Sequence, residues 1–171
     1  MEVNIIEVKK AKRGDAAAFA GLYQQIYADL YRFALYTLKN KNDAEDVVSE
    51  TVVDAFASIG KLYQAEKFKG WIFRILYNKC KDKLREYTKK DIELPEDYRE
   101  IPAEEKIEDG VVMRTLFFEL SEEDRLIISM HLFAGYTSKE IAKLLGINEN
   151  TVRSKESRAL KKLARMIELE S

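Results

Sequence analysis

The sequence has one cysteine, two prolines and seven glycines in 171 residues. The lone Cys80 excludes an intrachain disulfide framework and a cysteine-based zinc site, and it favours a reducing compartment, the cytoplasm. The scarcity of proline and glycine favours long helices over turn-rich sheet. No run of about 18 apolar residues is present, so no membrane span is expected. Residues 1–12 also lack a secretory hydrophobic stretch.

Signatures of catalysis are missing as well. The chain contains no glycine-rich phosphate loop, no metal-ligand spacing and no nucleophile–base pattern. His131 lies in an apolar stretch without neighbouring acids or cysteines, so we interpret it as a packed or surface residue. Cys80 is interpreted as a small core residue. We therefore expect no catalytic residue, no metal site and no cofactor.

Charge divides the chain into three parts. Residues 1–90 carry 17 Lys or Arg against 12 Asp or Glu, residues 91–110 carry 2 against 9, and residues 111–171 carry 10 against 9. The acidic segment also holds both prolines, which stiffen a chain, while like charges extend it. We predict an all-α protein in which two small helical domains, 1–90 and 111–171, are joined by an acidic linker over 91–110.

Apolar residues recur at steps of three and four through the first domain, which is typical of amphipathic helices. Asn42 and Asp43 offer an N-cap, and Gly60 offers a C-cap, for the second of these helices. The elements predicted here are a helix over 19–34, a helix over 44–59, a loop over 61–67 and a helix over 68–87.

In the second domain, Ser121 is a good N-cap because three acids follow it in the first turn, where the helix dipole favours them. Gly135 is expected to end that helix. The elements predicted here are a helix from 111 to 120, a helix from 121 to 133, a helix over 138–145 and a helix over 149–167.

The last two predicted helices have the spacing of a helix-turn-helix. Ala142 lets two helices cross closely, Gly146 suits a left-handed turn, and Val152 pins the second helix to the first. Ile141, Leu145, Ile147 and Leu160 are expected to fill the space between them. On the second helix, we expect Val152, Ala159, Leu160, Leu163 and Ile167 to point inward.

The opposite face of that helix is polar and basic. Residues 149–165 hold six basic and two acidic side chains, which fits the major groove of DNA. A basic helix alone is more often a solvated surface, but the spacing of Ala142, Gly146 and Val152 favours DNA binding.

A second basic surface is predicted on the helix over 68–85. Arg74, Asn78, Lys81 and Arg85 fall on one narrow stripe, and most of the remaining circumference is apolar or aromatic. Either several helices enclose that apolar surface, or some aromatic side chains stay exposed and stack on unpaired bases. The sequence leaves these two alternatives open.

Four stretches in this order resemble the extracytoplasmic-function branch of the bacterial sigma factors, over about residues 8–165. The stretch 43–50 (DAEDVVSE) is similar to the helix that docks on the clamp of RNA polymerase, and 69–72 (KGWI), with Asn78, Asp82 and Arg85, to the segment that melts and reads the minus-ten element. The stretches 135–147 and 151–159 are similar to the helix-turn-helix that reads the minus-thirty-five element. Ser49 stands where the family often has Gln, and Lys155 where it often has Arg.

The resemblance implies a non-catalytic subunit that gives RNA polymerase its promoter specificity. Its partners would be core polymerase and promoter DNA, and the family also has inhibitory anti-sigma proteins as separate chains. The implied polymerase-binding residues are Asp43, Glu45, Asp46, Ser49, Glu50 and Asp54. The implied minus-ten residues are Lys61, Lys67, Phe68, Lys69, Trp71, Arg74, Asn78, Lys81 and Arg85. The implied upstream-element residues are Asn150, Thr151, Arg153, Ser154, Lys155, Ser157, Arg158, Lys161 and Lys162.

Two other classes compete with this reading. A stand-alone regulator would bind an operator as a dimer through the C-terminal domain, and would need no polymerase to bind its site. A helical adaptor would have no DNA target, and association with DNA at low salt would count against it.

Overall fold

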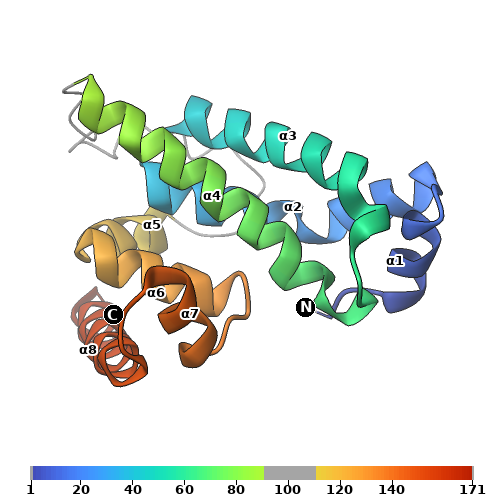
Figure 1. Ribbon diagram of the computed structural model, residues 1–171. Coiled ribbons are helices and arrows are strands. Elements are labelled where there is room, and N and C mark those ends of the chain that lie inside the picture. Colours follow the sequence, from blue (N-terminus) through green and yellow to red (C-terminus); the bar gives the residue numbers. More distant parts are fainter. Residues whose placement is uncertain (1, 91–110, 171) are drawn as a thin grey trace. The chain divides into compact units, whose positions relative to one another are not determined.

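The computed structural model describes residues 2–90 and 111–170, and the predicted acidic linker lies outside these residues. The described residues form eight α-helices and two short 3-10 helices without any strand, so the all-α prediction is confirmed (Figure 1). They divide into two compact units, one within Met1–Leu94 and the other within Pro95–Ser171. No helix in the described part is long and apolar enough to cross a membrane.

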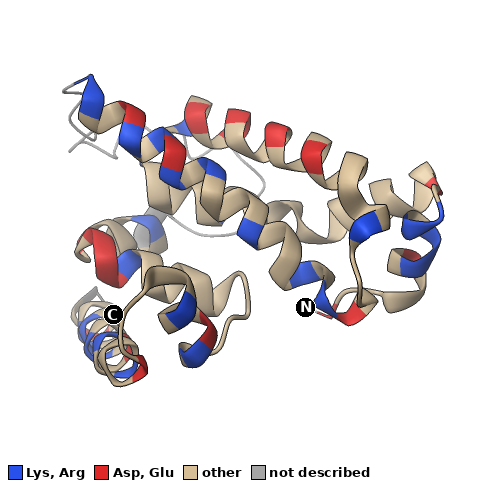
Figure 2. Ribbon diagram, viewed as in Figure 1, with Lys and Arg blue, Asp and Glu red and all other residues tan. Residues whose placement is uncertain are grey.

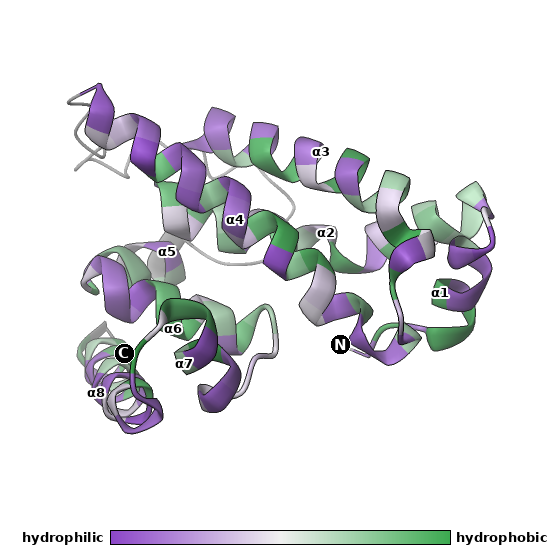
Figure 3. Cartoon of the chain, viewed as in Figure 1, coloured by the Kyte–Doolittle hydropathy of each residue, from purple (hydrophilic) through white to green (hydrophobic). Residues whose placement is uncertain are grey.

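The N-terminal unit is built around one long helix, α2. The second half of α2, Leu30–Leu38, is buried except for Arg32. The helices α1 (Ile5–Lys12), α3 (Lys41–Ser58) and α4 (Phe68–Lys89) all pack against α2. The helices α1, α3 and α4 are each amphipathic, with one side buried and another exposed (Figure 3). The elements are α1 (Ile5–Lys12), α2 (Ala16–Leu38), α3 (Lys41–Ser58), η1 (Ile59–Lys61), η2 (Ala65–Lys67) and α4 (Phe68–Lys89).

Both caps predicted for α3 are wrong, although the observed last residue, Ser58, lies one residue from the predicted end at 59. Asn40, in extended conformation, caps the helix by accepting a hydrogen bond from the Asp43 N–H at 2.9 Å, so Asn42 and Asp43 lie inside the first turn. Gly60 is not left-handed, because the chain continues directly into η1 instead of turning away. The helix α1 was not predicted separately, although the Asn4 side chain caps it.

The connection between α3 and α4 is ordered by a spacing of three. Ile59, Leu62, Ala65 and Phe68 are buried, and a period of three places one side chain per turn of 3-10 helix on the same side. The predicted loop over 61–67 therefore has an inner apolar edge, and its remaining side chains face solvent.

The C-terminal unit contains four helices around a small core. The Ser121 side chain accepts a hydrogen bond from the Asp124 N–H at 3.2 Å, so the predicted N-cap is confirmed. Gly135 has a φ of 70° just after α6, where the helix was expected to end. The elements are α5 (Val111–Phe118), α6 (Glu122–Leu132), α7 (Ser138–Leu145) and α8 (Glu149–Glu170).

The inner face of α8 is narrower than predicted. Val152, Ala159 and Leu163 are buried, but Leu160 and Ile167 are each 44% exposed. Leu160 and Ile167 lie to one side of the line through the buried residues, because a helix advances 100° per residue. The prediction that they point inward is therefore wrong.

Candidate nucleic-acid and partner-binding surfaces

The turn between α7 and α8 has the geometry that its sequence predicts. Gly146 adopts φ 68° and ψ 32°, and its N–H donates to the Ala142 carbonyl. Ala142 is buried, as is Val152 on the facing side of α8. A side chain with a Cβ resists this left-handed conformation, so glycine fits the turn. The helix-turn-helix is thus confirmed.

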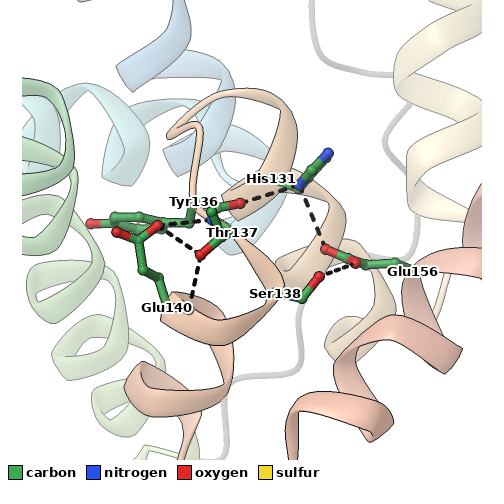
Figure 4. Close-up of polar contacts among 6 residues, drawn as sticks. All are labelled: His131, Tyr136, Thr137, Ser138, Glu140 and Glu156. Atoms are coloured by element: carbon green, nitrogen blue, oxygen red, sulfur yellow. Dashed lines mark hydrogen bonds and ion pairs between the residues drawn. The ribbon is translucent and has the colours of Figure 1, made fainter.

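The start of α7 is held by a reciprocal capping box. The Thr137 hydroxyl accepts from the Glu140 N–H at 3.2 Å, and the Glu140 carboxylate accepts from the Thr137 N–H at 2.9 Å (Figure 4). The next residue ties α7 to α8, because the Ser138 hydroxyl donates to Glu156 at 2.8 Å. These bonds fix the angle at which the two helices meet.

The histidine belongs to the same network. The His131 Nδ1 atom lies 3.2 Å from the Tyr136 carbonyl oxygen and 3.6 Å from a Glu156 carboxylate oxygen (Figure 4). No group of His, Cys, Asp and Glu that could hold a metal ion occurs in the described part of the chain. Burial raises the pKa of the Cys80 thiol, which disfavours the reactive thiolate. His131 therefore contacts the residues that hold α7 and α8 together, and Cys80 is a buried core residue.

Most of the predicted upstream-element residues lie on the exposed side of α8. Arg153 is exposed and ion-paired with Glu149 one turn earlier. Two others contact their own unit: the Lys155 ammonium lies 2.8 Å from Glu123, and Lys162 donates to the Glu119 carbonyl at 2.7 Å. The exposed members of the set are Asn150, Thr151, Arg153, Ser154, Ser157, Arg158, Lys161 and Lys162.

The predicted stripe on α4 lies at the surface. Arg74, Asn78 and Arg85 are exposed, and the half-buried Lys81 holds its ammonium 5.7 Å from the centre of the Tyr77 ring. The acid Asp82 pairs with Arg85 at 3.4 Å. Figure 2 colours the ribbon of α4 blue at its basic residues.

The aromatic and apolar residues of α4 divide between the two alternatives that the sequence left open. Phe68 is 1% exposed, so the prediction that its ring contacts a base is wrong, because its place in the period-three spacing turns it into the core. Trp71 is half-exposed with its ring 6.0 Å from that of Phe68. Ile72, Phe73, Leu76 and Cys80 are buried, whereas Trp71, Ile75, Tyr77 and Leu84 are partly exposed.

One exposed aromatic side chain in the loop before α4 was not predicted as a site residue. Tyr63, between η1 and η2, is 92% exposed, and the exposed Lys61 and Lys67 flank it. Its backbone is fixed, because Leu62 is buried beside it and the Tyr63 carbonyl accepts from Lys12 at 3.5 Å. The buried spacing of three in this loop was the signal that Tyr63 points outward.

The acidic residues of α3 recur along the outer side of the helix (Figure 2). Ala44, Val47, Val48, Thr51 and Ala55 are buried and leave the carboxylates toward solvent. Of the predicted polymerase-binding residues, Asp43 and Glu45 are half-buried, and Asp46, Ser49, Glu50 and Asp54 are exposed.

Several of these carboxylates form ion pairs with α4 that the sequence did not predict. The Lys79 ammonium lies 2.7 Å from Asp54 and 3.5 Å from Glu50, and the hydrogen bond to Asp54 raises the pKa of Lys79. Lys83 lies 3.2 Å from Asp43. Lys69, in the first turn of α4, pairs instead with α2, and its ammonium lies 3.8 Å from Asp29.

Asp43 also accepts a hydrogen bond from the Tyr87 hydroxyl. Burial, and then the bond to this carboxylate, raise the pKa of Tyr87. The contact joins the first turn of α3 to the last turns of α4. It therefore fixes the two helices at the end farthest from the loop between them.

Comparison with protein families gives two matches in one chain. Residues 22–90 match Sigma-70 region 2, and residues 113–163 match Sigma-70, region 4. The first range covers most of α2 and all of α3 and α4, with the surfaces just described on α3 and α4. The second covers the helix-turn-helix and the basic side of α8.

Curated relatives carry corresponding names. The RNA polymerase sigma factor SigV of Bacillus subtilis is 32% identical over 78% of this chain and 81% of its own length. The ECF RNA polymerase sigma factor SigM of Mycobacterium tuberculosis is 28% identical over 90% of this chain and 79% of its own.

Solved structures share the fold. The sigma factor RpoE from Bartonella quintana, in complex with the anti-sigma factor NepR, matches 90% of this chain and 98% of its own with a TM-score of 0.69 and 24% identity. CnrH in complex with the cytosolic domain of CnrY matches 99% of both chains with a TM-score of 0.66 and 23% identity.

Proposed function

This chain belongs to the extracytoplasmic-function RNA polymerase sigma factors of the sigma-70 family, and we propose how its surfaces divide the work of promoter recognition. The first unit binds core polymerase and the minus-ten element, and the second reads the minus-thirty-five element. The observation that carries this proposal is that region 2 and region 4 matches occur in order on one chain, each on a unit with an exposed basic surface.

We assign polymerase binding to the outer side of α3. Its exposed Asp46 and Ser49 lie on a helix whose other side is anchored by buried Val47 and Val48. A rigid acidic helix suits a basic partner surface because complementary charge steers encounter and fixes register.

We assign the minus-ten element to α4 and the loop before it. Arg74 and Arg85 provide cations for phosphates, and the half-exposed Trp71 provides an aromatic face. Tyr63 joins this set, because an exposed aromatic ring between Lys61 and Lys67 suits an unstacked base. Single-stranded DNA is held by such combinations of cations and aromatic rings.

We assign the minus-thirty-five duplex to α8. Arg158 and Lys161 are exposed on the basic side, and Arg153 can exchange its pairing with Glu149 for DNA. A helix of this kind enters the major groove, where arginine reads guanine by a bidentate contact. The stand-alone regulator is not favoured, because residues 22–90 match Sigma-70 region 2.

Two further proposals concern the cellular compartment and a protein partner. We place the protein in the cytoplasm, where polymerase and chromosome lie. We also propose an anti-sigma partner, since the similar RpoE chain is crystallised with the anti-sigma factor NepR.

Run-off transcription tests the proposed function. Core polymerase of the source organism, freed of sigma factors, is incubated with genomic fragments with and without this protein. We expect transcripts from defined start sites only when both proteins are present. Start sites that do not change on adding the protein, together with no association with core enzyme, would refute the proposal.

A further inference from the structure

The exposed side of α3 carries two rows of side chains, one made of paired carboxylates and one that contains the unpaired Asp46. Asp43, Glu50 and Asp54 form the row beside α4, where Lys79 and Lys83 lie within 3.5 Å of them. Asp46 has no ion pair among the described residues and belongs to the other row. The same helix thus presents neutralised and unneutralised carboxylates.

The second row is a continuous stripe along α3. It consists of Asn42, Asp46, Ser49 and Val53, which are all exposed and are spaced four, three and four apart. Residues at such steps lie above one another on a helix. This outer stripe is polar at its start and apolar at its end, where Val53 is 67% exposed.

Lys79 of α4 is held firmly against the carboxylates of the first row. Its side chain is only 21% exposed, and its ammonium is shared by Asp54 at 2.7 Å and Glu50 at 3.5 Å. A cation brought against these carboxylates by a partner would meet a positive charge already in place. Like charges repel at this range even near the surface, although salt weakens the effect.

We propose that Lys79 is a specificity-determining residue for polymerase docking, because it withdraws Glu50 and Asp54 from a basic partner and leaves the outer stripe as the contact. This inference rests on the proposed docking of polymerase to α3. It assigns the dominant charged contact to Asp46 and gives α4 a part in polymerase binding as well as in DNA binding.

Substitutions on α4 provide a matched comparison. Lys79→Met and Lys89→Met change the net charge equally and both lie on α4, but Lys89 is exposed in the last turn and belongs to neither surface assigned to a partner. Affinity of the full chain for core polymerase is measured by fluorescence anisotropy at low and raised salt. We expect Lys79→Met to bind about two- to five-fold more tightly, less so at raised salt. Lys89→Met and the conservative Lys79→Arg should match the wild type.

Neutralising the carboxylates tests the same inference without touching Lys79. Asp46→Asn should weaken binding to core polymerase, while Asp54→Asn, whose carboxylate is already paired, should change it little. Equal losses in these two variants would overturn the proposal, and so would equal affinities of Lys79→Met and Lys89→Met. Asp46→Lys separates the two levels of failure. If it still binds core polymerase normally, docking to α3 itself is refuted, and the role of Lys79 falls with it.

Discussion

Single side chains divide sharply into those that hold the fold and those that are offered to partners. Phe68 and Tyr63 lie five residues apart, yet one ring is 1% exposed and the other 92% exposed. The difference follows from the 3-10 spacing of the loop, which buries every third residue from Ile59. Aromatic content alone does not identify a base-binding residue, because the local period decides which rings are exposed.

Replacing Tyr63 tests its assigned role. We expect Tyr63→Ala to reduce promoter opening by holoenzyme by about five- to 160-fold, since stacking of a base on an aromatic ring contributes about 1–3 kcal/mol. Tyr63→Phe keeps the ring and should open promoters normally. Opening is followed by 2-aminopurine fluorescence in the minus-ten element. Equal opening by Tyr63→Ala and wild type would remove this residue from the site.

Arg158 tests the reading helix at the same scale. Arg158→Ala should lose discrimination at one upstream base pair by about 1–3 kcal/mol if its contact is bidentate. Loss that is uniform over all upstream sequences would instead identify a phosphate contact. Competition between single-base variants of the upstream duplex, measured with holoenzyme, distinguishes these outcomes. Unchanged competition in the mutant would contradict an Arg158 contact.

At the scale of elements, the helix-turn-helix was predictable because its turn has a strict local requirement. The spacing of Ala142, Gly146 and Val152 is typical of a helix-turn-helix, and the structure has Gly146 at φ 68° and Val152 buried. The α3–α4 ion pairs were not predictable in the same way. Lys79 and Asp54 are 25 positions apart, and only the packing of two helices brings them together. The C-cap of α3 was predicted wrongly, because Gly60 suggested a left-handed stop whereas it lies in the 3-10 helix that follows.

Two glycines give a paired prediction at this scale. An added Cβ meets nothing within 4 Å at either Gly146 or Gly21, so only the backbone distinguishes them. Gly146→Ala should destabilise the C-terminal unit by about 1–2 kcal/mol, because its backbone is left-handed. Gly21→Ala, inside α2, should stabilise its unit by about 0.5–1 kcal/mol. Urea unfolding measures both, and shifts of the same sign would contradict the account.

At the scale of the whole molecule, DNA binding is divided between two units, each with its own basic surface. Each unit can contact only a few phosphates, and non-specific affinity of that kind corresponds to a Kd of about 10⁻⁴–10⁻⁶ M. The near-neutral chain, with a net charge of −1, adds little long-range attraction to DNA. Polymerase would hold both units on one promoter, so that two weak contacts act together.

The most direct test of this account is a titration of promoter duplex with the free protein, with core polymerase, and with both together at physiological salt. The promoter is one that the holoenzyme selects from genomic fragments. We predict weak binding by the free protein and tight, sequence-specific binding only when core polymerase is present. Tight and specific binding by the free protein would contradict the account, because the two units would then read DNA without polymerase.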